Sequence, residues 1–151
     1  MSNKITDLYR DKPSNPRKKL MFDLPLPPSV NHMYYNLRNG RRVLTKTAKK
    51  YIADSKALVN LAIEEQDWRK QKKSVWFYVD LLFYMPDRKI RDSHNMIKLL
   101  LDGLQGNAVN NDYYVMPRVQ GVEYDKENPR VSIRVSMQSE AQRKRALNMF
   151  K

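Results

Sequence analysis

The chain has 151 residues, a length that suits one domain with a single hydrophobic core. Its 29 lysines and arginines outnumber its 16 aspartates and glutamates, giving a formal net charge of +13 that an anionic partner would offset. Nucleic acid is the commonest such partner, and anionic lipid or a merely solvated basic surface are the alternatives. The absence of cysteine excludes disulfides, thiolate zinc sites and a cysteine nucleophile, and it fits a reducing cytoplasm.

Residues 1–19 are predicted to form a flexible basic arm, because they are polar, contain prolines and show no periodicity. They lack the apolar core of a signal peptide, and no stretch of the chain reaches the roughly 18 apolar residues of a membrane span. We therefore expect a soluble, cytoplasmic protein. Six basic residues of the arm face two acidic ones, namely Lys4, Arg10, Lys12, Arg17, Lys18 and Lys19 against Asp7 and Asp11.

The first half of the folded region predicts a strand, a hairpin and a helix. The strand Leu20–Leu24 ends at a proline-rich segment that cannot donate to a sheet. The segments Tyr34–Asn36 and Arg42–Leu44 flank Asn39-Gly40, a strong hairpin signal because both residues tolerate positive φ. From Thr45, a plausible N-cap, apolar residues recur at helical spacing to about Glu65.

The second half predicts the central strand, the second main helix and two further strands. Residues 75–85 form an apolar run, interrupted at Asp80, that suits a strand covered on both faces, and residues 92–104 follow as a helix stopped by Gly103 and Gly106. Residues 113–124 and 130–137 predict strands, and Ser139 with Gln142 forms a capping-box pattern for a short basic helix. The order predicts a single α/β domain with a mixed sheet and two main helices, spanning residues 20–138, followed by a basic C-terminal helix or tail over 139–151.

Polar residues concentrate where the central strand runs into the second helix. At about 100° per residue, Arg91, Asn95, Lys98 and Asp102 fall on one stripe of a helix that is otherwise too apolar to face water. Cleavage of a phosphodiester requires a divalent cation with oxygen ligands, and Asp92 at the start of the helix is placed to provide one. Lys98 is suited to pairing with a phosphate.

Structural interpretations of the same residues remain open. Asp92 is also a good N-cap, and Lys98 with Asp102 is an ordinary i,i+4 ion pair. Asp112 lies in an Asn-Asn-Asp run that is good turn chemistry, and only a closed tertiary fold would bring it beside Asp92. These residue types alone do not decide between catalysis and structure.

Several motifs, agreeing in order and spacing, resemble the RusA family of Holliday-junction endonucleases, which is common in bacteriophage and prophage genomes. The family pattern has a Met-Pro-Asp-Arg approach, an Asp-x-Asp-Asn-x-x-Lys motif, a leucine-rich helix and an Asp-Asp pair before a strand. The corresponding segments span about Leu20 to Val135, and they are Pro27-Pro28-Ser29-Val30-Asn31, Met85-Pro86-Asp87-Arg88, Asp92-Ser93-His94-Asn95-Met96-Ile97-Lys98, Asp102-Gly103-Leu104 and Asn111-Asp112.

The resemblance implies a homodimer with two metal sites, each nicking one of two opposed strands of a four-way DNA junction. It also implies that Asp92 and Asp112 bind Mg²⁺ or Mn²⁺, and that Lys98 and Arg91 contact the scissile phosphate. The chain departs from the family where its second aspartate is His94 and where the first member of the Asp-Asp pair is Asn111. An imidazole ligand suits Mn²⁺ better than Mg²⁺, so we predict a preference for Mn²⁺, with His94 as a helix-start hydrogen-bonding residue as the alternative.

Basic residues frame the hairpin and the start of the first helix, where they would neutralise phosphates. Tyr34 and Tyr35 either stack on bases or pack in the core. The predicted DNA-contacting set is Asn31, Tyr34, Arg38, Arg41, Arg42, Lys46, Lys49, Lys50, Arg88 and Lys89. The competing function is a non-catalytic DNA-binding or regulatory protein on the same scaffold, which the loss of carboxylates at His94 and Asn111 permits, and an RNA-binding accessory protein is a third class.

Overall fold

The computed structural model describes residues 19–28, 33–69, 75–91, 93–110 and 112–151. Of the predicted arm, residues 1–18 lie outside this described part, and Lys19 opens the first strand. The elements are β1 (Lys19–Leu24), β2 (Tyr34–Asn36), β3 (Arg42–Leu44), α2 (Lys46–Gln66), β4 (Phe77–Met85), α3 (Ser93–Leu104), the 3₁₀ helix η2 (Asp112–Tyr114), β5 (Val115–Tyr124), β6 (Arg130–Met137) and α4 (Glu140–Asn148).

Four strands form one mixed sheet in the order β1-β6-β4-β5. β4 runs parallel to β5 and antiparallel to β6, and β1 is antiparallel to β6. The parallel pair requires a crossover connection, which α3 provides. The predicted α/β class, with one mixed sheet and two main helices, is confirmed. Because β4 lies between two strands, its edges are not available for pairing with a second chain.

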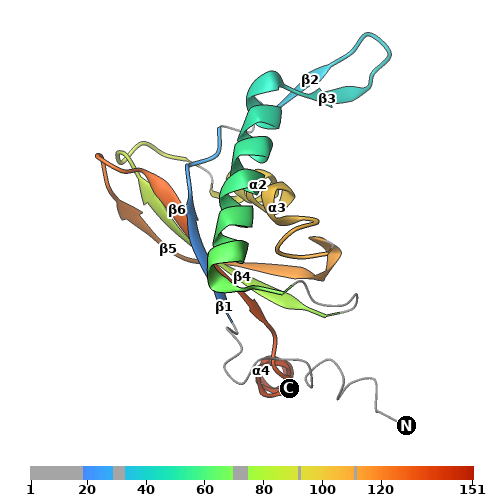
Figure 1. The fold of residues 1–151 in the computed structure, drawn as a ribbon, viewed down its shortest axis with the longest axis vertical. Helices are drawn as coiled ribbons and strands as arrows, with labels where there is room; N and C mark the ends of the chain where they lie inside the picture. The colour runs from blue at the N-terminus through green and yellow to red at the C-terminus, as the bar shows by residue number, and fades with distance from the viewer. Residues whose placement is uncertain (1–18, 29–32, 70–74, 92, 111) are drawn as a thin grey trace.

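The hydrophobic core lies between the sheet and the helices α2 and α3, which cover one face (Figure 1). Alternate residues of β4 point into it, and Val79, Leu81 and Phe83 are fully buried. α3 contributes Met96, Leu99, Leu100 and Leu104. The apolar runs that predicted a buried strand and a buried helix therefore meet each other in this core.

Two local predictions are wrong, and each has a physical reason. Gly103 does not stop the second helix but lies inside α3, where a Cβ atom would stand only 2.9 Å from the Cβ of Ser55 in α2. Glycine therefore permits the close approach of the two helices, and Gly106, with a φ of +87°, takes the left-handed conformation beyond the helix end. Tyr113 and Tyr114 belong to η2 and not to the strand, which begins at Val115.

The hairpin of β2 and β3 is fixed to the core only at its base. Met33 is completely buried, Leu44 packs against the core, and the Thr45 amide donates to the Met33 carbonyl over 2.7 Å. Thr45 also caps α2 as predicted, because its side chain accepts a hydrogen bond from the Ala48 amide. The rest of the hairpin projects past the start of α2 (Figure 1).

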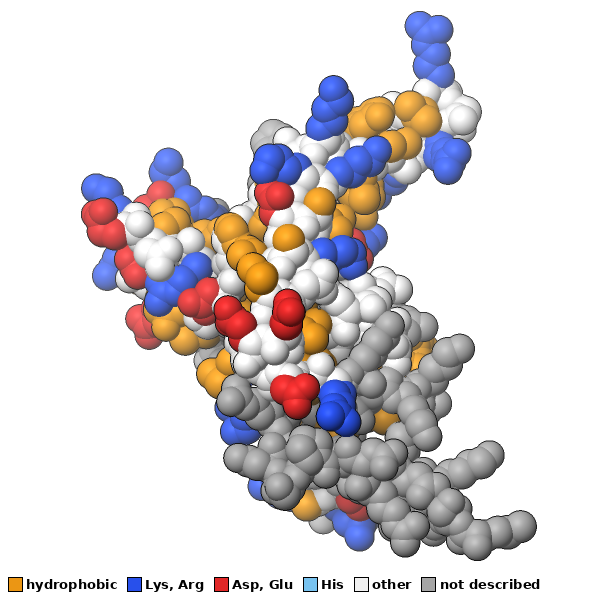
Figure 2. Space-filling model, viewed as in Figure 1, with side chains coloured by type: hydrophobic (Ala, Val, Ile, Leu, Met, Phe, Trp, Pro, Cys, Tyr) orange, Lys and Arg blue, Asp and Glu red, His pale blue; other side chains and the backbone are white. Residues whose placement is uncertain are grey.

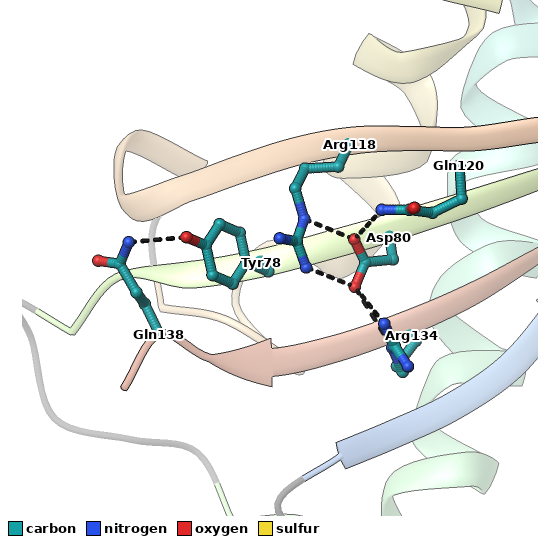
Figure 3. A network of polar contacts seen from close by, with 6 residues as sticks. All are labelled: Tyr78, Asp80, Arg118, Gln120, Arg134 and Gln138. Carbon is teal, nitrogen blue, oxygen red and sulfur yellow. Dashed lines mark hydrogen bonds and ion pairs between the residues drawn. The ribbon is translucent and has the colours of Figure 1, made fainter. Parts of the chain in front are cut away.

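Among the described residues, side chains and not helices cover the other face of the sheet. Asp80 of β4 is only 4% exposed and accepts hydrogen bonds from Arg118, Gln120 and Arg134 on the neighbouring strands (Figure 3). The guanidinium carbon of Arg118 also lies 3.5 Å from the centroid of the Tyr78 ring. The polar residue that interrupts the apolar run is thus a buried anion neutralised by flanking arginines.

Burial acts to raise the pKa of Asp80, but the hydrogen bonds from Arg118, Arg134 and Gln120 outweigh it and lower the pKa below its ordinary value. A carboxylate with a lowered pKa in the folded state stabilises the fold above its unfolded pKa of about 3.9. That contribution is lost as the pH falls through the folded pKa.

We predict that Asp80→Asn lowers the free energy of unfolding by about 1–3 kcal/mol at neutral pH, because two guanidinium groups lose their shared counter-charge. Urea unfolding from pH 7 to pH 3 measures the free energy of unfolding. We expect this free energy to fall less below about pH 4 in the variant than in the wild type, because the variant lacks the carboxylate that becomes protonated. Asp54→Asn, which removes an exposed pair with Lys50, is the matched control and costs about 0.5 kcal/mol or less. Equal losses in the two variants would contradict a central role for Asp80.

The C-terminal helix α4 forms as its capping box predicts. The Ser139 hydroxyl accepts from the Gln142 amide, and the Gln142 side chain accepts from the Ser139 amide. No residue of α4 is buried, and Leu147 stays half exposed. This helix therefore adds little to the core.

Candidate functional site

The base of the hairpin meets the exposed face of α3 at the ring of Tyr34. The Lys98 ammonium nitrogen of α3 lies 5.2 Å from the centroid of this ring, and the guanidinium carbon of Arg42 in β3 lies 4.8 Å from it. Both distances fall within the range of cation–π attraction. The fold therefore brings together three of the predicted site residues, which come from three elements, β2, β3 and α3.

The electrostatics of Lys98 reflect this contact. A hydrogen bond to the Tyr34 side chain is the largest cause that raises the pKa of Lys98 above its ordinary value, and Asp102 acts in the same direction. Desolvation and the nearby positive charge of Arg42 act to lower it. Lys98 is exposed and remains a cation that an approaching phosphate can contact.

Arg91 is held by a carboxylate that precedes it by four residues. Its Nη1 and Nη2 atoms donate to the two carboxylate oxygens of Asp87 over 2.5 and 3.2 Å. Asp87 also accepts from the Lys89 amide, so it organises the loop between β4 and α3. The hydrogen bond from Arg91 is the main reason that the pKa of Asp87 falls to about 2.

The basic surface follows the hairpin and the beginning of α2. Figure 2 shows lysine and arginine gathered over this end of the molecule, with acidic side chains toward the other end of α2. Arg38, Arg41, Lys46 and Lys49 are exposed, and no acidic residue lies in the first turn of α2. Lys50 is partly neutralised, because it forms an ion pair with Asp54 over 2.6 Å.

Two further predicted DNA contacts, Arg88 and Lys89, lie in the loop before α3 and are exposed. The guanidinium carbon of Arg88 stands 5.1 Å from the centroid of the Tyr124 ring, at the end of β5. Asn31, the remaining member of the predicted set, lies outside the described residues. Arg88 and Lys89 are therefore both exposed to an approaching ligand.

The predicted metal ligands are described only in part. His94 is an exposed residue in the first turn of α3, and Asp112 begins η2, which packs against α3. Asp92 and the side chain of Asp112 lie outside the described part, as do Asn111 and the side chain of Asn95. No three described histidine, aspartate or glutamate side chains lie together as a metal site. The metal site stays a prediction.

Sequence reasoning missed two features beside these residues. The first is Asp87 as the partner of Arg91, although their spacing of four residues is a recognised ion-pair signal in helices. The second is an aromatic cluster in which Trp76 packs against Tyr113 and Tyr114, with ring centroids 5.7 and 5.3 Å away. Because Trp76 precedes β4 and the tyrosines precede β5, only the parallel pairing of these strands brings the rings together.

Comparison with known protein families gives a match. A family model described as endodeoxyribonuclease RusA matches residues 25–136. The chain belongs to the endodeoxyribonuclease RusA family. The match to RusA runs from the proline segment through the hairpin, both main helices, β4 and β5 to Ser136 in β6, and it stops before α4.

No curated protein matches the chain. None of the helices in the described part of this RusA-family chain is long and apolar enough to cross a membrane.

We predict that Arg91→Gln raises the pKa of Asp87 from about 2 toward the ordinary value of about 3.9, because it removes the main hydrogen-bond donor to that carboxylate. Carboxyl carbon NMR over pH 1.5–6 measures the change. Arg88→Gln is the matched control, since Arg88 contacts Tyr124 and not Asp87. An unchanged pKa in Arg91→Gln would contradict the Arg91–Asp87 pairing in this RusA-family loop.

Proposed function

We propose that this RusA-family chain is a metal-dependent endonuclease that resolves four-way DNA junctions by paired, symmetric nicks. The observation that supports this best is the meeting of a basic hairpin with Lys98 at the ring of Tyr34. It joins a surface suited to DNA phosphates to a cation suited to the scissile phosphate. The activity belongs to a homodimer, because a two-fold axis supplies two equivalent sites for two opposed strands.

The hairpin and the start of α2 bind the DNA backbone in this proposal. The exposed cations offset phosphate charge, and the positive end of the helix dipole at the start of α2 favours anions. Contacts of this kind position the duplex arms and carry no sequence information. The residues assigned to them are Asn31, Tyr34, Arg38, Arg41, Arg42, Lys46, Lys49, Lys50, Arg88 and Lys89.

The cleavage site is assigned to the residues around the start of α3. Two carboxylates and one imidazole, from Asp92, Asp112 and His94, form a donor set that fits a divalent cation and favours Mn²⁺ over Mg²⁺. The bound cation would stabilise charge on the phosphate and activate water. Lys98 and Arg91 pair with the scissile phosphate, and Asp87 orients Arg91 for that contact.

We predict that the protein nicks a labelled four-way junction at symmetric positions on two opposed strands and leaves a linear duplex of the same sequence intact. Lys98→Ala lowers the single-turnover rate about 100-fold or more, because a charge that stabilises the transition state is removed. Asp92→Asn abolishes cleavage while junction binding persists. Sequencing gels of each strand map the nicks.

Folded protein that binds the junction but does not cut it in Mg²⁺ or Mn²⁺ would instead support a non-catalytic DNA-binding protein. In that case the junction affinity is also unchanged by metal and by Asp92→Asn. Competition with an RNA hairpin distinguishes an RNA-binding accessory protein, which would prefer the RNA.

We predict faster cleavage in Mn²⁺ than in Mg²⁺, since an imidazole ligand suits the transition metal. His94→Asp restores a carboxylate and increases the ratio of the Mg²⁺ rate to the Mn²⁺ rate. Single-turnover rates across a series of both metals measure this ratio. A wild-type enzyme that is equally fast in Mg²⁺ would remove the reason for assigning His94 as a ligand.

A further inference from the structure

Tyr34 occupies a position that its role in DNA contact does not explain. The residue opens β2, and two cations lie near its half-buried ring: Arg42, in its own hairpin, and Lys98, in α3. A tyrosine whose purpose is to stack on nucleobases needs a free face. Here two cations already lie within reach of the ring.

The position of the ring is set by the core. Tyr34 directly follows the buried Met33 and pairs across the hairpin with Leu44, which packs on the core. The 2.7 Å hydrogen bond between the Thr45 amide and the Met33 carbonyl closes this base. The neighbouring Tyr35 is 50% exposed, so the two adjacent tyrosines have different surroundings.

Electrostatics favours a specific role for Tyr34. Lys98 and Arg42 repel each other, and the repulsion acts against the charged form of Lys98. The π-face of an aromatic ring is electron-rich, and its hydroxyl oxygen accepts a hydrogen bond, so Tyr34 attracts the same ammonium that Arg42 repels. The pKa of Lys98 is raised on balance, with the hydrogen bond to the Tyr34 side chain as the largest cause and Asp102 acting in the same direction.

We propose that Tyr34 is a positioning residue for Lys98: its ring and hydroxyl hold the ammonium group of α3 in place from the hairpin. This inference rests on the proposed function, because it assigns Lys98 to the scissile phosphate. It makes the placement of the cleavage lysine depend on the element that binds DNA. A backbone phosphate that pairs with Arg42 also neutralises the charge that repels Lys98, and so strengthens the hold of Tyr34.

The test separates binding from cleavage. Tyr34→Phe keeps the aromatic ring and removes the hydroxyl, whereas Tyr34→Leu removes both. The affinity of each variant for the junction is measured without divalent metal, so that no cleavage occurs. At saturating protein in Mn²⁺ we expect the single-turnover rate to fall about tenfold in Tyr34→Phe and up to about 100-fold in Tyr34→Leu. Junction affinity falls by a smaller factor, because the cations of the hairpin and of α2 keep their phosphate contacts. In a Lys98→Ala background Tyr34→Leu causes no further loss, because its effect passes through Lys98.

Leu37→Ala is the matched control, because Leu37 is a half-exposed apolar residue at the turn of the same hairpin. It is expected to leave rate and affinity unchanged. Weaker junction binding in Tyr34→Leu with an unchanged saturated rate would overturn the proposal and make Tyr34 a DNA contact alone. An equal further loss in the Lys98→Ala background would overturn it as well.

A second readout does not depend on cleavage. NMR of protein labelled with ¹³C,¹⁵N-lysine reports the pKa of the Lys98 ammonium group. The Lys98 signal is assigned by its loss in Lys98→Arg. We expect the pKa of Lys98 to fall in Tyr34→Phe and in Tyr34→Leu. Unchanged signals in both variants would overturn the contact itself. A wild-type protein that never cleaves overturns the proposed function and the positioning role with it, whereas a cleaving wild type with an unaffected Tyr34→Leu overturns the positioning role alone.

Discussion

The packing of α2 and α3 against one face of β4 is the constraint on which the remaining structure depends. α3 exposes Lys98 on one side because Met96, Leu99 and Leu100 are committed to that core on the other. The hairpin is fixed in the same core through Met33 and Leu44. One apolar layer therefore sets the relative position of the DNA-binding element and the cleavage lysine, although the two are far apart in the sequence.

The opposite face of the sheet is covered by arginine and tyrosine side chains. A strand buried on both faces normally requires helices on both, and here arginine side chains replace one helical layer. Arg118 lies on Tyr78 and Arg130 lies on Tyr84, with guanidinium carbons 3.5 and 3.7 Å from the ring centroids. Asp80 supplies the buried counter-charge. Part of the large positive charge of the chain is thus structural, which separates these arginines from the exposed cations assigned to DNA.

Local chemistry accounts for what the sequence predicted well. The bounds of β2 and β3 follow from Asn39-Gly40, where Gly40 takes a φ of +79°, and the caps at Thr45 and Ser139 act within three residues. Tertiary contacts account for what it did not. Asp80 pairs with arginines 38 and 54 residues away in the sequence. The sequence predicts a helix stop at Gly103 because the approach of Ser55 leaves no local pattern. The meeting of Tyr34 with Lys98 belongs to this second class, and the metal ligands remain predictions from the family pattern.

Crystals of the protein with Mn²⁺ and a four-way junction would test the central claim most directly, through the anomalous signal of manganese. The account predicts a manganese peak in coordination range of Asp92, His94 and Asp112, with Lys98 beside the nearest backbone phosphate and Tyr34 against Lys98. A peak bound elsewhere, or a junction whose phosphates lie along the hairpin but far from Lys98, would contradict it.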